Sequence, residues 1–196
     1  TTEIYTLSLH DALPIYGRMV LYFFAAGMVS APLCTLFYFT NPYEPWINST
    51  VAYYFLVNAP SEELAKFLVF WAVARVLGSV KDPVDALIQG AAVGVGFAFV
   101  ENIGYSSRID LACLAVRGVF SLAGHGTYTA LAAFAWGVWD YYARDERSLV
   151  SRGLPILGLV SATCLHASFN SLGTLGPAAS DWMFFLDVFC ITILTW

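Results

Sequence analysis

Ser61-Glu62-Glu63-Leu64-Ala65-Lys66 places two acids and a lysine inside an apolar run that extends from Val51 to Leu77. The run is long enough to cross a bilayer, for which about 20 apolar residues suffice. A charge at membrane depth is costly unless it is paired or hydrated, so such residues usually belong to functional sites. This stretch therefore predicts a membrane-spanning helix that carries polar chemistry.

The local pattern also predicts how the charges are arranged. Pro60 can begin a helical segment, which would place Glu62 and Glu63 in the first turn, where the helix dipole favours carboxylates. At 3.6 residues per turn, Glu62 and Lys66 share one face and Glu63 points about 100° away. The structural alternative is a helix cap combined with a salt bridge at a helix interface.

The composition extends this interpretation to the whole chain. Of the 196 residues, 59% are hydrophobic and 12% are charged, whereas soluble domains average roughly 45–50% and about 25%. The four cysteines lie singly in apolar segments, without the paired spacing of zinc or redox sites, and we interpret them as core residues. We predict an all-α membrane protein, a polytopic transmembrane helical bundle in the lipid bilayer, with no nucleic-acid partner.

About six spans are expected in this fragment, and its two ends are unusual. Residues 1–15 (TTEIYTLSLHDALPI) resemble translated adapter sequence, so we treat them as a non-native segment. The chain stops at Trp196 inside an apolar run, and we expect one transmembrane helical domain over residues 16–196, truncated at its C-terminus. The expected spans are 16–39, 51–77, 86–105, a segment within 111–142, 153–172, and an incomplete span after 181.

Arginine and lysine fall on alternate connections, with Arg108 as the one exception. Segments 78–85 and 143–152 and their borders carry several of them, whereas 41–50 and 173–181 carry none. Cytoplasmic loops are enriched in these residues, so the first pair of segments is expected in the cytoplasm and the second pair outside.

In three further spans, small or polar residues recur every three or four positions and so form a stripe along one face of the helix. Glycines on such a stripe let a second helix approach closely, and a polar stripe in lipid must face inward. We therefore expect these stripes to line one water-accessible cavity that opens to the outside. The stripes are Gly90, Gly94, Phe97 and Glu101; Arg117, Ser121, His125 and Thr129; and Thr163, His166 and Asn170.

Together these patterns give a candidate site. A glutamate and a histidine in a secluded wet pocket can activate water, and an asparagine with a second histidine can stabilise an oxyanion. His125, His166 and Glu63 are alternatively able to bind zinc, although the zincin signature His-Glu-x-x-His is absent. A zinc cofactor and no cofactor both fit. The candidate catalytic residues are Glu62, Glu63, Glu101, His125, His166 and Asn170, with Lys66, Asn102 and Arg117 in support.

The ordered motifs resemble a known family. They are Glu62-Glu63-x-x-Lys66, Phe97-x-x-x-Glu101-Asn102, His125, and His166-x-x-x-Asn170, and as a set they are similar to those of the PrsW family of intramembrane proteases, relatives of the CAAX prenyl proteases and bacteriocin-processing membrane enzymes. The resemblance covers about residues 51–172. It implies a multi-pass endopeptidase of the bacterial cytoplasmic membrane that cuts single-pass proteins, typified by an anti-sigma factor cleaved on its outer side.

The resemblance also implies roles. By analogy with the CAAX branch, Glu62 or Glu63 would activate water, and His166 and Asn170 would hold the oxyanion. One position departs from that branch, because its Phe-x-x-x-His is here Phe97-x-x-x-Glu101. His125 is then the candidate for the missing imidazole, and a glutamate-based and a metal-dependent mechanism both stay open.

Two functions of other classes also fit buried acids and histidines. The first is a proton-coupled small transporter or channel, since chains of such residues serve as proton relays. The second is a non-catalytic membrane scaffold with the same fold. The halves of the chain show no inverted repeat, which argues against the transporter.

Overall fold

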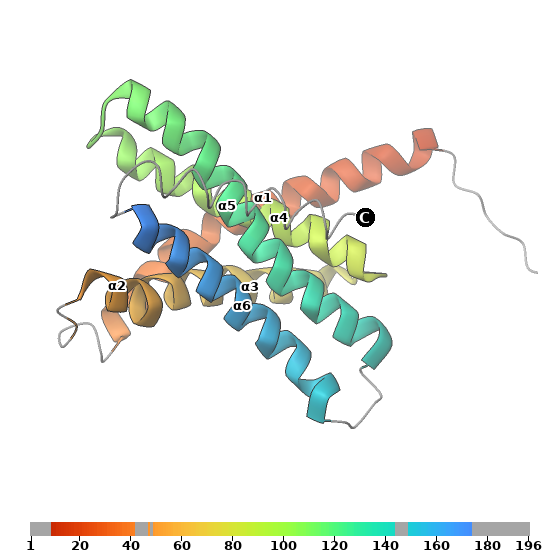
Figure 1. Ribbon diagram of the computed structural model, residues 1–196. Helices are drawn as coiled ribbons and strands as arrows, with labels where there is room; N and C mark the ends of the chain where they lie inside the picture. Colours follow the sequence, from red (N-terminus) through yellow and green to blue (C-terminus); the bar gives the residue numbers. More distant parts are fainter. Residues whose placement is uncertain (1–8, 42–46, 48, 144–148, 174–196) are drawn as a thin grey trace, which may run out of the picture.

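Five long helical segments cross one another in the computed structural model, which describes residues 9–41, 47, 49–143 and 149–173 (Figure 1). Every element in these ranges is helical. The elements are α1 (Leu9–Thr40), α2 (Thr50–Tyr53), the π-helix η2 (Tyr54–Asn58), α3 (Ala59–Leu77), α4 (Pro83–Ser106), α5 (Leu111–Val138), the π-helix η3 (Trp139–Ala143) and α6 (Leu149–Gly173).

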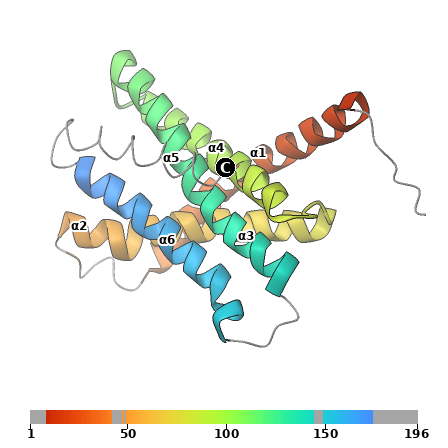
Figure 2. The ribbon, with the colours of Figure 1, turned by 45° about the vertical axis from the view of Figure 1, so that its right-hand side comes forward.

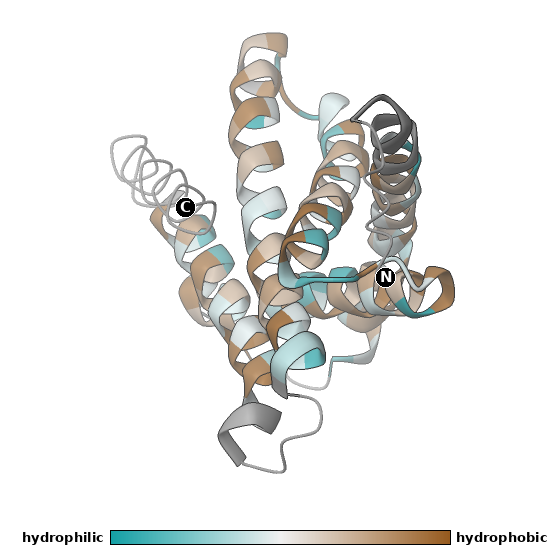
Figure 3. Cartoon of the chain, turned by 90° about the vertical axis from the view of Figure 1, so that its right-hand side faces the viewer, coloured by the Kyte–Doolittle hydropathy of each residue, from teal (hydrophilic) through white to brown (hydrophobic). Residues whose placement is uncertain are grey.

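The apolar surface agrees with a membrane environment. Among the described residues, two helices are long and apolar enough to cross a bilayer, over Gly17–Thr40 and Pro83–Ser106. Large apolar side chains such as Phe39, Val76 and Leu111 are exposed, and apolar residues cover outward faces of the helices (Figure 3). The predicted fold class, an all-α membrane protein, is confirmed. The predicted incomplete sixth span lies outside the described residues.

The segment that carries the acid pair begins with an irregularity that Pro60 explains. Helix α3 has Pro60 and Glu62 in its first turn, as predicted, but Glu63 falls after that turn, and η2 and α2 continue the same segment toward the N-terminus. Proline lacks an N–H and its ring clashes with the carbonyl four residues earlier, which is that of Leu56. The π-helical turn relieves this clash, and Asn41 Nδ2 donates to the Leu56 carbonyl over 3.5 Å.

Short connections then reverse the chain twice. Helix α3 ends at Gly78, which adopts a left-handed conformation with φ 56° that favours glycine. Helix α4 begins after Asp82, whose side chain accepts from the backbone N–H groups of Val84 and Asp85 at 2.8 and 2.9 Å. Only residues 107–110 separate α4 from α5. Helices α4 and α5, joined by this short connection, pack extensively against each other.

Glycines set how closely the helices pack. A methyl group on Gly94 would lie 2.0 Å from the carbonyl oxygen of His125, and one on Gly90 would lie 2.4 Å from Cβ of Ala133. The predicted close approach along this stripe is confirmed, with α5 as the neighbouring helix. On the other side of α4, a methyl group on Gly96 would lie 2.0 Å from the Phe24 carbonyl oxygen of α1. Helix α4 is thus held between α1 and α5.

Helix α5 also contacts α6, so it lies between α4 and α6 (Figure 2). It is continuous from Leu111 to Val138 and is not broken at Gly124. Below the acid pair, Phe70 of α3 packs edge-on against Trp136 of α5 with ring centroids 5.5 Å apart. This apolar layer closes the bundle at one end of the site.

Candidate functional site

Glu62 has two carboxylate oxygens in different surroundings. Its side chain is buried, and Oε1 accepts from the Tyr38 hydroxyl at 2.6 Å and from Asn58 Nδ2 at 2.8 Å. Oε2 is also buried but has no hydrogen-bond partner among the described residues. A buried carboxylate oxygen without a hydrogen bond costs free energy, so Oε2 is the atom of this site at which we expect a further ligand.

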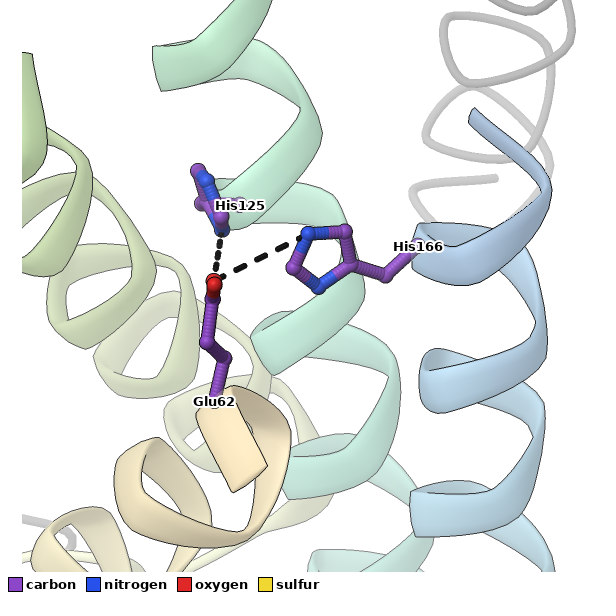
Figure 4. A group of neighbouring side chains, drawn as sticks. All are labelled: Glu62, His125 and His166. Atoms are coloured by element: carbon purple, nitrogen blue, oxygen red, sulfur yellow. Dashed lines mark ion pairs between the residues drawn. The ribbon is translucent and has the colours of Figure 1, made fainter. Parts of the chain in front are cut away.

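Two imidazoles face this oxygen. Glu62 Oε2 lies 4.0 Å from Nδ1 of His125 and 3.7 Å from Nε2 of His166 (Figure 4). The three side chains come from α3, α5 and α6, and one ligand atom from each lies within 4.8 Å of the others. All three are at most 5% exposed. The arrangement can hold a metal ion with one oxygen and two nitrogens.

His125 is fixed from several sides. Its Nε2 is 3.0 Å from Glu101 Oε2, its Nδ1 is 2.8 Å from Lys66 Nζ, and its ring packs against Phe97 with centroids 5.1 Å apart. The backbone carbonyl of His125 lies against Gly94 of α4. A methyl group at Gly94 would displace this turn of α5.

His166 is also held by a carboxylate and an aromatic ring. Its Nδ1 is 2.8 Å from Glu63 Oε1, which leaves Nε2 toward Glu62. Its ring stacks on Tyr128 of α5, with centroids 5.2 Å apart and planes 13° apart. Each histidine therefore has a carboxylate behind it, an arrangement that orients metal-ligating imidazoles in proteins.

The lysine pairs with a different acid than predicted. Lys66 Nζ donates to Glu63 Oε1 over 2.5 Å, at i,i+3, and not to Glu62 at i,i+4. Tyr38 and Asn58 bind Oε1 of Glu62. The side chains of Glu63 and Lys66 are both fully buried, and two buried charges are stable only as a pair.

Glu101 connects the polar stripe of α5 to the site. Arg117 Nη2 lies 2.9 Å from Glu101 Oε1, and Ser121 donates to Oε2 over 3.4 Å. Further along the stripe, Thr129 donates to Glu63 Oε2 over 3.5 Å. The prediction that this stripe faces the protein interior is confirmed.

The two predicted asparagines do not contact the carboxylates. Asn170 Nδ2 donates to Asn58 Oδ1 over 2.7 Å, and Asn58 in turn holds Glu62. Asn102 Oδ1 is buried and has no hydrogen-bond partner in the described part of the chain. Asn170 is thus linked to Glu62 through Asn58, whereas Asn102 takes no part in this group of polar side chains.

Two cavities meet at the acid. The α6-side cavity, of about 320 Å³, lies between α5, α6 and η2, and the α1-side cavity, of about 510 Å³, lies between α1, α4 and η2. Glu62 and Glu101 line both cavities, whereas Glu63 lines neither. His125 and Asn170 line the α6-side cavity, but His166 lines neither cavity, so the prediction of one cavity lined by every polar stripe is wrong at His166. Water and a substrate can therefore reach Glu62 and Glu101, and Glu63 acts from behind His166.

Tyr38 and Asn58 were missed as site residues in the sequence. Asn58 lies one helical turn before Glu62, so the i,i+4 spacing was a usable signal. Tyr38 is 24 residues from Glu62 and sits on α1, and no local pattern links the two. Only the packing of α1 against α3 brings them together.

The donor set fits a metal ion, with one change from the predicted ligands. The sequence suggested His125, His166 and Glu63, but Glu63 Oε1 already accepts from Lys66 and contacts His166. The free oxygen belongs to Glu62. Two imidazoles and one carboxylate, with carboxylates behind the imidazoles, match the donors of hydrolytic zinc sites. A metal ion on His125 Nδ1 would take the place of Lys66 Nζ, which lies 2.8 Å from that nitrogen.

Comparison with known proteins gives a consistent result. The model of a family described as PrsW family intramembrane metalloprotease matches residues 17–195. Protease PrsW of Shouchella clausii (strain KSM-K16) is 23% identical over 167 residues, which are 85% of this chain and 74% of that protein. Protease PrsW of Geobacillus kaustophilus (strain HTA426) is 25% identical over 104 residues, 53% of this chain and 46% of that protein. No solved structure matches the chain.

Proposed function

The chain belongs to the PrsW family of intramembrane metalloproteases, and we therefore propose that it hydrolyses peptide bonds of single-pass membrane proteins at Glu62, His125 and His166. A membrane peptidase of this kind acts on proteins in the bilayer. We further propose that the chain is a multi-pass protein of the bacterial cytoplasmic membrane and that its substrates include anti-sigma-factor-like proteins cut in regulated proteolysis.

The observation that carries a metal-dependent mechanism is the environment of Glu62 Oε2. This buried oxygen has no hydrogen-bond partner among the described residues, and it faces one nitrogen of each histidine at 3.7 and 4.0 Å. Glu62, His125 and His166 would hold the ion, and zinc is the metal that this donor set suits. When bound, the ion supplies Lewis-acid polarisation of the peptide carbonyl.

The remaining polar residues prepare the site for this chemistry. Glu63 accepts from Nδ1 of His166, and Glu101 accepts from Nε2 of His125, so each carboxylate orients one imidazole. Lys66 balances the charge of Glu63 in the buried layer. Glu63 and Lys66 act through the histidines and do not need to touch the substrate.

In this proposal, Glu101 transfers the proton. Its side chain is 21% exposed and lines both cavities, so it can take a proton from the attacking water and deliver it to the leaving amine. Asn170 lines the α6-side cavity and uses one N–H for Asn58. Its second N–H is available to stabilise the oxyanion.

The test measures cleavage and bound zinc on the same purified protein in lipid. The substrates are a library of single-pass reporters with a randomised juxtamembrane segment. Glu101→Gln should retain zinc and lose about 10²–10⁴-fold in cleavage rate, as expected for loss of a general base. Glu62→Gln should lose both zinc and cleavage. Lys81→Gln, an exposed change outside the site, is the control.

Two results would contradict the proposal. Undiminished cleavage by the Glu62→Gln/Glu63→Gln double variant would remove the acid pair from the chemistry and leave it as a structural cap and salt bridge. Absence of any fragment from wild type and variants, together with pH-dependent flux of a solute, would point to the transporter instead.

A further inference from the structure

The α1-side and α6-side cavities share one wall, and this wall contains Glu62 and Glu101 of the proposed catalytic groups. The residues that line both are Tyr54, Asn58, Glu62, Glu101 and Tyr105. From this wall the two cavities extend to opposite sides, one along α1 and the other toward α6. A chain that passed from one cavity to the other would therefore cross Glu62.

The α1-side cavity is lined by Glu62 but by neither histidine. Ala31, Cys34 and Thr35 of α1 and Gly104 of α4 form small-residue parts of its wall, while Tyr53 and Phe97 add aromatic surface and Asn58 and Arg108 add polar groups. At about 510 Å³ it lies within the roughly 300–1,000 Å³ of clefts that hold a small ligand. It has room for a large side chain.

The α6-side cavity offers hydrogen-bond donors that a peptide backbone needs. Helical walls have no free strand edge, because their backbone groups are bonded within the helix, so an extended chain at this depth must bond to side chains. Arg117 lines this cavity with a side chain that is 31% exposed, and its guanidinium lies over the Tyr105 ring at 3.7 Å from the centroid. Its Nη2 is engaged with Glu101, which fixes the guanidinium.

We propose that the two cavities are the two halves of one substrate cleft, which holds an extended polypeptide segment with the bond to be cut over Glu62. The α1-side cavity selects a large side chain on one side of that bond. On the other side, the exposed part of the Arg117 guanidinium donates to a substrate carbonyl in the α6-side cavity. This inference rests on the proposed protease function and adds the substrate class and its orientation.

Gly104 provides a selective test of the α1-side cavity. A methyl group on Gly104 meets no atom within 4 Å, so Gly104→Leu adds volume to the cavity wall without a clash. Gly118 has equally open space and lines neither cavity, which makes Gly118→Leu the matched control. Both variants should bind zinc like wild type.

The readout is the cleavage specificity for the reporter library. Gly104→Leu should lower kcat/KM at least 10-fold for reporters with Phe, Tyr or Leu at the selected position, and it should leave cleavage of reporters with Gly or Ala there unchanged. Gly118→Leu should keep the wild-type profile. An unchanged profile in Gly104→Leu, or equal losses in both variants, would overturn the proposal.

Crosslinking separates failure of this inference from failure of the protease function. A photoreactive amino acid at Thr35, which lines the α1-side cavity, is compared with one at Leu36, which does not line it and is exposed. The protein also carries Glu101→Gln, so reporters are not consumed. Crosslinks from position 35 and not from 36 support the cleft even if wild type cuts no reporter. Cleavage by wild type without crosslinks from position 35 overturns the cleft and leaves the protease function standing.

Discussion

Glu62 and Glu63 are adjacent in the chain, yet their side chains have different partners. Glu62 lines both cavities and presents a free oxygen to the two histidines. Glu63 is enclosed by Lys66, His166 and Thr129 and reaches neither cavity. Equivalent substitutions at the two positions should therefore have different effects, on metal binding for Glu62 and on the orientation of His166 for Glu63.

Tyr38 offers a test of how Glu62 is oriented. Its hydroxyl donates to Glu62 Oε1 and thereby helps to leave Oε2 for the metal. We expect Tyr38→Phe to lower zinc affinity about 10–100-fold, as is usual for loss of a partner behind a metal ligand. The measurement is a competition titration of zinc against a chelator. Tyr22→Phe, an exposed change on the same helix, is the control, and equal affinity in both variants would contradict the prediction.

Lys66 tests the buried ion pair. Removing one partner of a buried pair leaves an uncompensated charge and typically costs about 3–5 kcal/mol. We expect Lys66→Met to lower the free energy of unfolding by about this amount, measured in detergent, and to reduce expression. Glu63→Gln/Lys66→Met should recover part of the loss, because no charge is then stranded. A double variant less stable than Lys66→Met alone would argue against this account.

Two elements position these residues. The π-helical turn η2 ends at Asn58, directly before α3, and directs both Tyr54 and Asn58 to the shared cavity wall. Helix α5 is held against α4 at Gly94, so the His125 turn lies at a fixed distance from Glu101 of α4. The site therefore depends on backbone features as well as on its polar side chains.

Gly94→Ala should disturb the site through the helix packing. The added methyl group would lie 2.0 Å from the His125 carbonyl oxygen, so α4 and α5 must separate. We expect a loss of about 1–3 kcal/mol in stability, the usual cost of overpacking, together with weaker zinc binding. Thermal unfolding and zinc titration measure the two effects.

Gly118→Ala is the matched control for this change, because its methyl group meets no atom within 4 Å. Alanine is favoured over glycine within a helix by roughly 0.5–1 kcal/mol, so this variant should be neutral or more stable. Equal behaviour of the two variants would show that close packing at Gly94 does not hold the site.

At the scale of the whole molecule, the α1-side cavity and the charged connection that contains Lys81 lie at opposite ends of α4. Arg108, in the connection between α4 and α5, lines the α1-side cavity. Lys81 lies in the connection at the opposite end of α4, which the distribution of arginine and lysine assigns to the cytoplasm. The cleft is then expected to open on the outer side of the membrane.

Cysteine labelling tests this orientation. In a chain whose native cysteines are replaced, Ser107→Cys should react with an impermeant thiol reagent in intact cells, because residue 107 is exposed in the α4–α5 connection. Lys81→Cys, also exposed, should react only after the membrane is opened. Strong labelling of Lys81→Cys in intact cells would reverse the orientation and place the cleft on the cytoplasmic side.

Local pattern in the sequence was sufficient for the fold class and for the inward faces of the helices. Apolar length predicts helices in a membrane, and a 3.6-residue period decides which residues share a face. For this reason the glycine contact at Gly94 and the inward direction of Ser121 and His125 could be predicted from spacing alone. Both properties depend on residues within one helix.

The tertiary structure decided how atoms of different helices meet. That Glu62, and not Glu63, presents its free oxygen to His125 and His166, and that Tyr38 holds the other oxygen, depends on the crossing and depth of α1, α3, α5 and α6. The pairing of Lys66 with Glu63, and not with Glu62, has the same origin, since the carboxylates of both acids compete for partners from several helices. Periodicity within one helix carries no information about these distances, because they are set by close packing between residues far apart in the chain.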